Sequence, residues 1–95
     1  MSNETKKSVL ITGATSGIGF ASALAIACTG ARVLITGRNR ERGEEARQRI
    51  AEESNNPTVD LVIGDLSSLA GIDNLAEEVL KRTSRLDVLV NNAGY

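Results

Sequence analysis

The sequence contains no histidine and only one cysteine, Cys28, in its 95 residues. Without histidine the chain offers neither a Ser-His-Asp mechanism nor the usual histidine-ligated zinc site. A single cysteine excludes an internal disulfide framework and a cysteine-based metal site. We therefore expect no metal centre, and we interpret Cys28, which lies in an alanine-rich apolar run, as a small buried core residue.

The chain also lacks an excess of charge and a long apolar run. Its 11 lysines and arginines nearly balance 12 aspartates and glutamates, for a net charge of -1. This balance gives no electrostatic basis for binding nucleic acid or an anionic membrane. The first apolar run, Val9 to Ile11, is too short for a signal peptide or a membrane span. The default expectation is therefore one small cytoplasmic domain, with no membrane segment in this chain.

Short apolar segments alternate with helical patterns along the chain. Strands are predicted over residues 8–12, 31–36, 58–63 and 87–90, with helices over residues 17–28, 40–53 and after Ser67 or Ser68. Asn39 is a suitable N-cap for the second helix, Gly30 ends the first, and Asn55-Asn56-Pro57 ends the second. Such alternation predicts an α/β fold with a parallel sheet and right-handed crossovers.

Apolar residues at helical spacing predict which face of each helix is buried. The second helix has a narrow stripe of Ala46 and Ile50 on an otherwise charged surface. The inward faces predicted for the other two helices are Ile18, Ala21, Leu24, Ala25 and Cys28 in the first, and Ile72, Leu75, Ala76, Val79 and Leu80 in the third.

Three glycines lie between the first strand and the first helix, in the segment Thr12 to Gly19. A helix that begins here points its free N–H groups and its positive dipole end at a ligand above the strand ends, which favours a phosphate. Gly13 permits a sharp turn, Gly17 leaves room for a pyrophosphate, and Gly19 permits close packing of the helix on the strand. A purely structural turn is the alternative.

The second strand ends at Gly37-Arg38-Asn39-Arg40, about twenty residues beyond the glycines. In nucleotide-binding folds of this order, an acid at this place accepts hydrogen bonds from a ribose 2′-hydroxyl. No acid is present here, and the guanidinium of Arg38 matches the geometry of a 2′-phosphate. We therefore expect a preference for NADP(H) over NAD(H), the alternative being that Arg38 is simply a solvated residue at a strand end.

The third and fourth strands end in short polar motifs. Asp65 can accept a hydrogen bond from an adenine amino group, with Leu66 beside the ring, although Asp65 could equally be a turn or N-cap residue. Asn91 and Asn92 can bridge neighbouring strands, and the small pair Ala93-Gly94 leaves room for a ligand.

Taken together, these segments resemble the short-chain dehydrogenase/reductase superfamily, and the resemblance covers almost the whole chain. The Arg38 region and Asp65–Leu69 are similar to its NADP-preferring, retinol dehydrogenase-like branch. The resemblance implies a single domain over residues 1–95, the N-terminal portion of an NAD(P)-binding Rossmann fold. It also implies three helices and a four-stranded parallel sheet in the order 3-2-1-4. The implied reaction is hydride transfer between a nicotinamide cofactor and a carbonyl or alcohol substrate.

The resemblance also implies the roles of individual residues. Arg38 would meet the 2′-phosphate, with Arg40 as a second candidate because Ser16 stands where some NADP-preferring members carry a basic residue. Asp65 and Leu66 would contact the adenine, and Asn91 would steady the sheet and approach the adenosine, beside Asn92. The pyrophosphate would be held by Gly13, Thr15, Ser16, Gly17, Ile18 and Gly19.

The family's catalytic serine, tyrosine and lysine would lie beyond Tyr95, which itself follows Asn-Asn-Ala-Gly with no lysine after it. We therefore expect no catalytic residue here and no activity from these 95 residues alone. Loss of the acid/base group by itself costs about 10²–10⁴-fold in rate. Three hypotheses follow: the cofactor-binding portion of an NADP-dependent oxidoreductase, a non-catalytic dinucleotide-binding or dimer-partner module, or a truncated product without function.

The fourth strand is expected to be an exposed edge, with apolar faces left uncovered. Such edges invite aggregation or pairing with another chain. We therefore expect poor solubility of the isolated chain and an oligomer formed through this edge.

Overall fold

The computed structural model describes residues 7–14, 17–64, 69–83 and 86–90. The strands form one parallel sheet in the order β3-β2-β1-β4, which confirms the predicted fold class and strand order. Strands and helices alternate within these residues as β1 (Ser8–Ile11), α1 (Gly17–Ala27), β2 (Arg32–Gly37), α2 (Arg40–Ser54), β3 (Val59–Ile63), α3 (Leu69–Arg82) and β4 (Val88–Val90).

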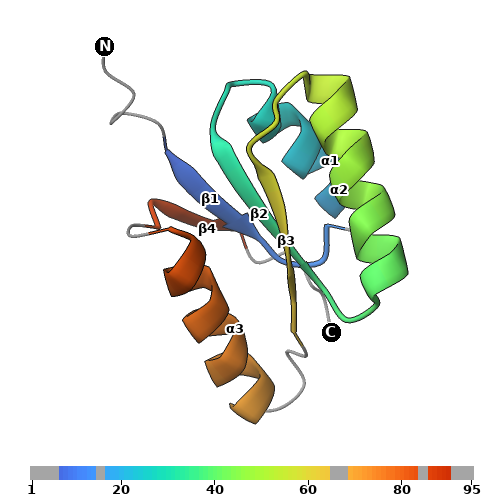
Figure 1. Ribbon diagram of the computed structural model, residues 1–95. Coiled ribbons are helices and arrows are strands. Elements are labelled where there is room, and N and C mark those ends of the chain that lie inside the picture. The colour runs from blue at the N-terminus through green and yellow to red at the C-terminus, as the bar shows by residue number, and fades with distance from the viewer. Residues whose placement is uncertain (1–6, 15–16, 65–68, 84–85, 91–95) are drawn as a thin grey trace.

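The sheet separates two hydrophobic layers. Helices α1 and α2 lie on one face and α3 lies on the other (Figure 1). Successive residues of a strand point to opposite faces, so Val9 and Ile11 join the core beneath α1 and α2, while Leu10 joins the core beneath α3. All four residues of β1 are buried, as expected for a strand in the interior of a parallel sheet.

Helix α1 is apolar on nearly every side, and it meets the sheet through its smallest residues. Gly19, Ala23 and Ala27, spaced four apart, are its buried positions. The predicted inward face was therefore wrong, since Ile18 is 77% exposed and Cys28 is also exposed. The sequence pattern of a helix that is apolar on all sides does not indicate which face is buried. Small residues lie against the sheet here because they let the helix backbone approach the strands closely.

Helix α2 follows its sequence pattern. The side chain of Asn39 accepts a hydrogen bond from the backbone N–H of Arg42 at 3.0 Å, which confirms the predicted N-cap. The predicted stripe of Ala46 and Ile50 is buried. Gly43 belongs to the same stripe, and a Cβ at this position would lie 2.6 Å from Cδ1 of Leu61, so glycine lets α2 pack tightly on β3.

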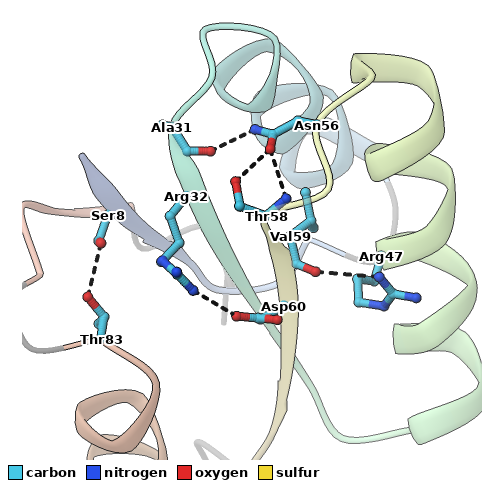
Figure 2. A network of polar contacts seen from close by, with 9 residues as sticks. All are labelled: Ser8, Ala31, Arg32, Arg47, Asn56, Thr58, Val59, Asp60 and Thr83. Atoms are coloured by element: carbon cyan, nitrogen blue, oxygen red, sulfur yellow. Dashed lines mark hydrogen bonds and ion pairs between the residues drawn. The ribbon is translucent and has the colours of Figure 1, made fainter. Parts of the chain in front are cut away.

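The buried side chain of Asn56 joins three segments of the chain. Its amide nitrogen donates to the carbonyl oxygens of Ala27 at 2.9 Å and Ala31 at 2.7 Å. Its oxygen accepts from the backbone N–H of Thr58 at 2.9 Å. Figure 2 shows Asn56 between the start of β2 and the start of β3. Asn55, in the left-handed conformation with φ 56°, ends α2 just before it.

Polar contacts also hold the amino ends of the strands on the α3 side. The hydroxyl groups of Ser8 and Thr83 lie 3.0 Å apart, and Arg32 forms an ion pair with Asp60 at 3.3 Å (Figure 2). The backbone N–H of Ser8 donates to the carboxylate of Asp87 at 2.9 Å. The two contacts of Ser8 fix the end of α3 and the start of β4 against β1, and the ion pair joins β2 to β3.

The region of α3 and β4 is only partly covered. Leu75 and Val79 are buried, but Ile72 and Leu80 of the predicted α3 stripe are 43% and 68% exposed. Strand β4 lies at the edge of the sheet, and its residue Leu89 is 59% exposed. The expectation of an exposed edge is confirmed, and the wide apolar face of α3 meets the sheet along one side only. Among the described residues, no helix is both long and apolar enough to cross a membrane.

Candidate functional site at the carboxyl ends of the strands

The carboxyl ends of the four parallel strands meet at one edge of the sheet. The backbone N–H of Thr12, just after β1, donates to the carbonyl of Val90 in β4 at 3.0 Å. The N–H of Gly64, just after β3, donates to the carbonyl of Gly37 in β2 at 3.0 Å. Backbone bonds therefore align these ends, and they place the chain after β1 between the ends of β2 and β4.

Two glycines on either side of the loop after β1 have positive φ angles. Gly13 has φ 68° and Gly17 has φ 64°, a region that other residues adopt only with strain. A Cβ built on Gly17 would have no heavy atom of another described part of the chain within 4 Å, apart from its chain neighbours and the backbone of its own helix. The open space beside the backbone at the start of α1 is what the approach of a pyrophosphate requires.

The next two residues of α1 have different surroundings. Gly19 is buried on the side of the helix that faces the sheet, which agrees with its predicted packing role. Ile18 is 77% exposed at the start of the helix. An exposed apolar side chain beside a helix N-terminus offers a surface against which the uncharged part of a ligand could lie.

Arg38 lies at the end of β2, which pairs with β1. Its side chain is exposed, and no ion pair joins it to a carboxylate of the described residues. Asn39 is used as the N-cap of α2. Within the part of the chain that the structure describes, Arg38 is therefore a cation without an acidic partner just after β2, the strand beside β1, and its five N–H donors suit a phosphate.

The structure thus brings part of the predicted site together. Six of the predicted site residues lie outside the described residues, and their roles stay predictions: Thr15, Ser16, Asp65, Leu66, Asn91 and Asn92. The predicted residues that are described at this edge are Gly13, Gly17, Ile18, Gly19 and Arg38.

Gly64 has a role that the sequence pattern did not reveal. A Cβ on Gly64 would lie 3.0 Å from Cδ1 of Leu75, so a side chain here would press against α3. Glycine therefore lets α3 lie close to the end of β3. The only sequence signal was a glycine directly after a predicted strand, which by itself indicates no more than a turn.

Comparison with known proteins agrees with this arrangement. The family model described as short chain dehydrogenase matches residues 7–95. The human protein "Dehydrogenase/reductase SDR family member 13" is 43% identical over 94 residues, which are 99% of this chain and 25% of that protein. Mouse "Retinol dehydrogenase 13" is 42% identical over 87 residues, 92% of this chain and 26% of its own length.

A solved structure of an actinorhodin polyketide ketoreductase with NADPH superposes with a TM-score of 0.88 and 34% identity. It covers 100% of this chain, which corresponds to 36% of the ketoreductase chain. The chain spans about a quarter of the length of the two curated relatives. By its sequence, its sheet order and its glycine loop, the chain belongs to the short-chain dehydrogenase family.

Proposed function

We propose that residues 1–95 form the cofactor-binding, N-terminal portion of an NADP-dependent oxidoreductase that transfers hydride between the nicotinamide and a carbonyl or alcohol. The names of the relatives, a dehydrogenase/reductase, a retinol dehydrogenase and a ketoreductase bound to NADPH, support this class of reaction. NADP(H) supplies or accepts the hydride, and the residues of this chain bind and orient it. The acid/base chemistry of such a protein needs residues that these 95 do not include.

One observation carries the cofactor assignment. The open space beside Gly17 and the guanidinium of Arg38, which has no ion-pair partner among the described residues, lie at neighbouring strand ends. The first suits the pyrophosphate and the second suits the 2′-phosphate that distinguishes NADP(H) from NAD(H). In the proposed complex, the loop from Gly13 to Gly19, including Thr15 and Ser16, holds the pyrophosphate. Asp65, Leu66, Asn91 and Asn92 lie along the adenosine.

The assignment is tested by the variant Arg38→Ala. Loss of a charge-assisted contact should weaken NADPH binding by about 1.5–3 kcal/mol, while NADH binding should change little because NADH has no 2′-phosphate. The measurement is titration of each cofactor, followed by its fluorescence. Arg82→Ala, which removes the same charge at the far end of α3, is the matched control and should leave both affinities unchanged. Equal losses for the two cofactors in Arg38→Ala would contradict the assignment.

A second candidate function is a non-catalytic module that binds dinucleotide or pairs with another chain. The uncovered β4 edge favours it, since Val88 is 41% exposed and Leu89 is 59% exposed on an end strand of the sheet. Light scattering after size-exclusion chromatography tests this: an oligomer that Leu89→Lys converts to monomer supports pairing through the edge. A wild-type monomer would contradict it.

A further inference from the structure

The first turn of α1 has few side chains that could fix its position. Two of its residues, Gly17 and Gly19, have no side chain, and Ile18 is 77% exposed. Glycine weakens a helix, and the first N–H groups of a helix have no partner within it. Phe20, the only phenylalanine of the chain, is the side chain of this turn that packs against the core. The position of the turn therefore depends on what holds Phe20.

Helix α2 holds the ring of Phe20 from its own side. The guanidinium of Arg49 lies over this ring, 4.7 Å from its centroid. The negative face of an aromatic ring attracts a cation, and at a partly exposed site such a contact is worth about two- to fivefold in an equilibrium. Helix α2 is itself firmly placed, since Asn39 caps its start and Ile50, next to Arg49, is fully buried. The contact thus ties the first turn of α1 to a helix that the core holds in position.

A second arginine of α2 has the same charge and different contacts. Arg47 pairs with Glu44 and donates to the carbonyl of Val59 in β3 at 3.5 Å (Figure 2). Arg49 forms an ion pair with Glu53 on its own helix at 3.4 Å, but both of these side chains are exposed, so the pair contributes little to stability. The contact of Arg49 with α1 is therefore the feature that distinguishes the two arginines.

We propose that Arg49 is a positioning residue for the dinucleotide: through the ring of Phe20, it holds the first turn of α1 where the backbone N–H groups of that turn meet the pyrophosphate. This inference rests on the proposed function, in which the open space beside Gly17 receives the pyrophosphate. Backbone donors bind a phosphate well only when they point at it, so a turn that is already fixed loses less freedom on binding than a mobile one. Arg49 lies on α2 and acts on the ligand only through Phe20.

The test is a double-variant cycle, measured by fluorescence titration of the 95-residue chain with NADPH. Arg49→Gln and Phe20→Leu should each weaken binding about threefold. Because both remove the same contact, the variant that carries both should also bind about threefold more weakly than the wild type, whereas independent effects would give roughly ninefold. Phe20→Tyr keeps an aromatic ring beneath the guanidinium and should retain the wild-type affinity. Arg47→Gln, the charge-matched control, should also bind NADPH as the wild type does.

A second ligand shows whether the effect passes through the pyrophosphate. Adenosine 2′-monophosphate has the adenosine and the 2′-phosphate of NADPH but no pyrophosphate, and its affinity is measured by displacement of NADPH. Arg49→Gln should leave this affinity unchanged, because the ligand does not use the first turn of α1. A residue that only stabilised the fold would weaken the binding of both ligands or of neither.

The outcomes separate the inference from the function on which it rests. If the wild type does not bind NADPH, the proposed function fails and the inference with it. If the wild type binds NADPH and Arg49→Gln binds it equally well, the proposed function stands and the inference is overturned. Equal losses in Arg49→Gln and Arg47→Gln also overturn it, because they indicate a general effect of charge.

Two further results would overturn the inference: additive effects of Arg49→Gln and Phe20→Leu, or an equal loss for the two ligands in Arg49→Gln. Thermal unfolding shows that each variant is folded at the temperature of the titration. Arg49→Gln is expected to fold as the wild type does, because the side chain of Arg49 is 61% exposed.

Discussion

The two faces of the sheet differ in how completely they are covered. Beneath α1 and α2, the side chains of Ile11, Val33 and Ile35 are fully buried. On the other face, Leu34 and Val62 are also fully buried, but α3 leaves Leu80 at 68% exposure and β4 leaves Leu89 at 59%. Two helices cover one layer except at Val88, which pairs with Val9 and is 41% exposed, whereas one helix and a three-residue edge strand leave the other layer more open.

The difference separates the predicted cofactor residues from most of the exposed apolar surface of this chain. The predicted cofactor residues Gly13, Gly17 and Arg38 are attached to β1, α1 and β2, which belong to the covered layer. Of the exposed large apolar residues, only Ile18 lies in α1 among the described residues, and the others lie in α3, in β4 or at Leu86 just before β4. If the predicted site binds a cofactor, we therefore expect the covered layer to hold it in place, and we expect the exposed apolar residues of α3 and β4 to favour contact with other protein.

The largest expected effect is on the free energy of unfolding, when one apolar side chain is truncated in each of the two layers. Ile35→Ala should lower the free energy of unfolding by about 2–5 kcal/mol, because it opens a cavity in the covered layer. Leu80→Ala should change it by less than about 0.5 kcal/mol, because an exposed side chain loses few contacts. Urea unfolding of both variants measures the difference. A similar loss in the two would show that Leu80 is buried in the protein in solution, and the comparison between the faces would fail.

The helices show what a sequence pattern can and cannot predict. In α2, charged residues surround a narrow apolar stripe, and the prediction of Ala46 and Ile50 as buried residues is confirmed. In α1, apolar residues lie on every side, so the spacing of apolar residues could not show which face is buried. The prediction that Cys28 is buried was therefore wrong. The contact of α1 with the sheet is decided by side-chain size, which favours Gly19.

The positions of the candidate site residues could be predicted where they depend on local backbone geometry and on the order of motifs along the chain. The glycines and the strand ends follow from local motifs, and their meeting at one edge follows from the parallel strand order. The packing of α1 against α2 was not predictable, because the contact of Arg49 with the ring of Phe20 exists only in three dimensions. Asn56 was expected only to break a helix, and its bonds to Ala27 and Ala31 exist only in three dimensions.

Asn56 offers a smaller test within the covered layer. Asn56→Ala should lower the free energy of unfolding by roughly 1–3 kcal/mol, because the carbonyl of Ala31 and the N–H of Thr58 lose a buried partner. Asn55→Gly is the matched neighbour: Asn55 is exposed and has a positive φ that glycine adopts freely, so this variant should be nearly neutral. Denaturant unfolding measures both. If Asn56→Ala were as mild as Asn55→Gly, the three segments would be held by packing alone.

The smallest expected effect is that of the surface ion pair between Glu44 and Arg47, whose atoms approach to 2.6 Å. The hydrogen bond from Arg47 lowers the pKa of Glu44 below its ordinary value of 4.5. A lowered pKa means that the pair stabilises the fold above the ordinary value and that this contribution is lost as pH falls through the lower, folded-state value. Because Glu44 is exposed, solvent screening keeps the contribution below about 0.5 kcal/mol. Glu44→Gln should therefore lower the free energy of unfolding slightly at pH 7 and by less at pH 3, as measured by urea unfolding at both. A loss that is larger at pH 3 than at pH 7 would contradict the sign of this linkage.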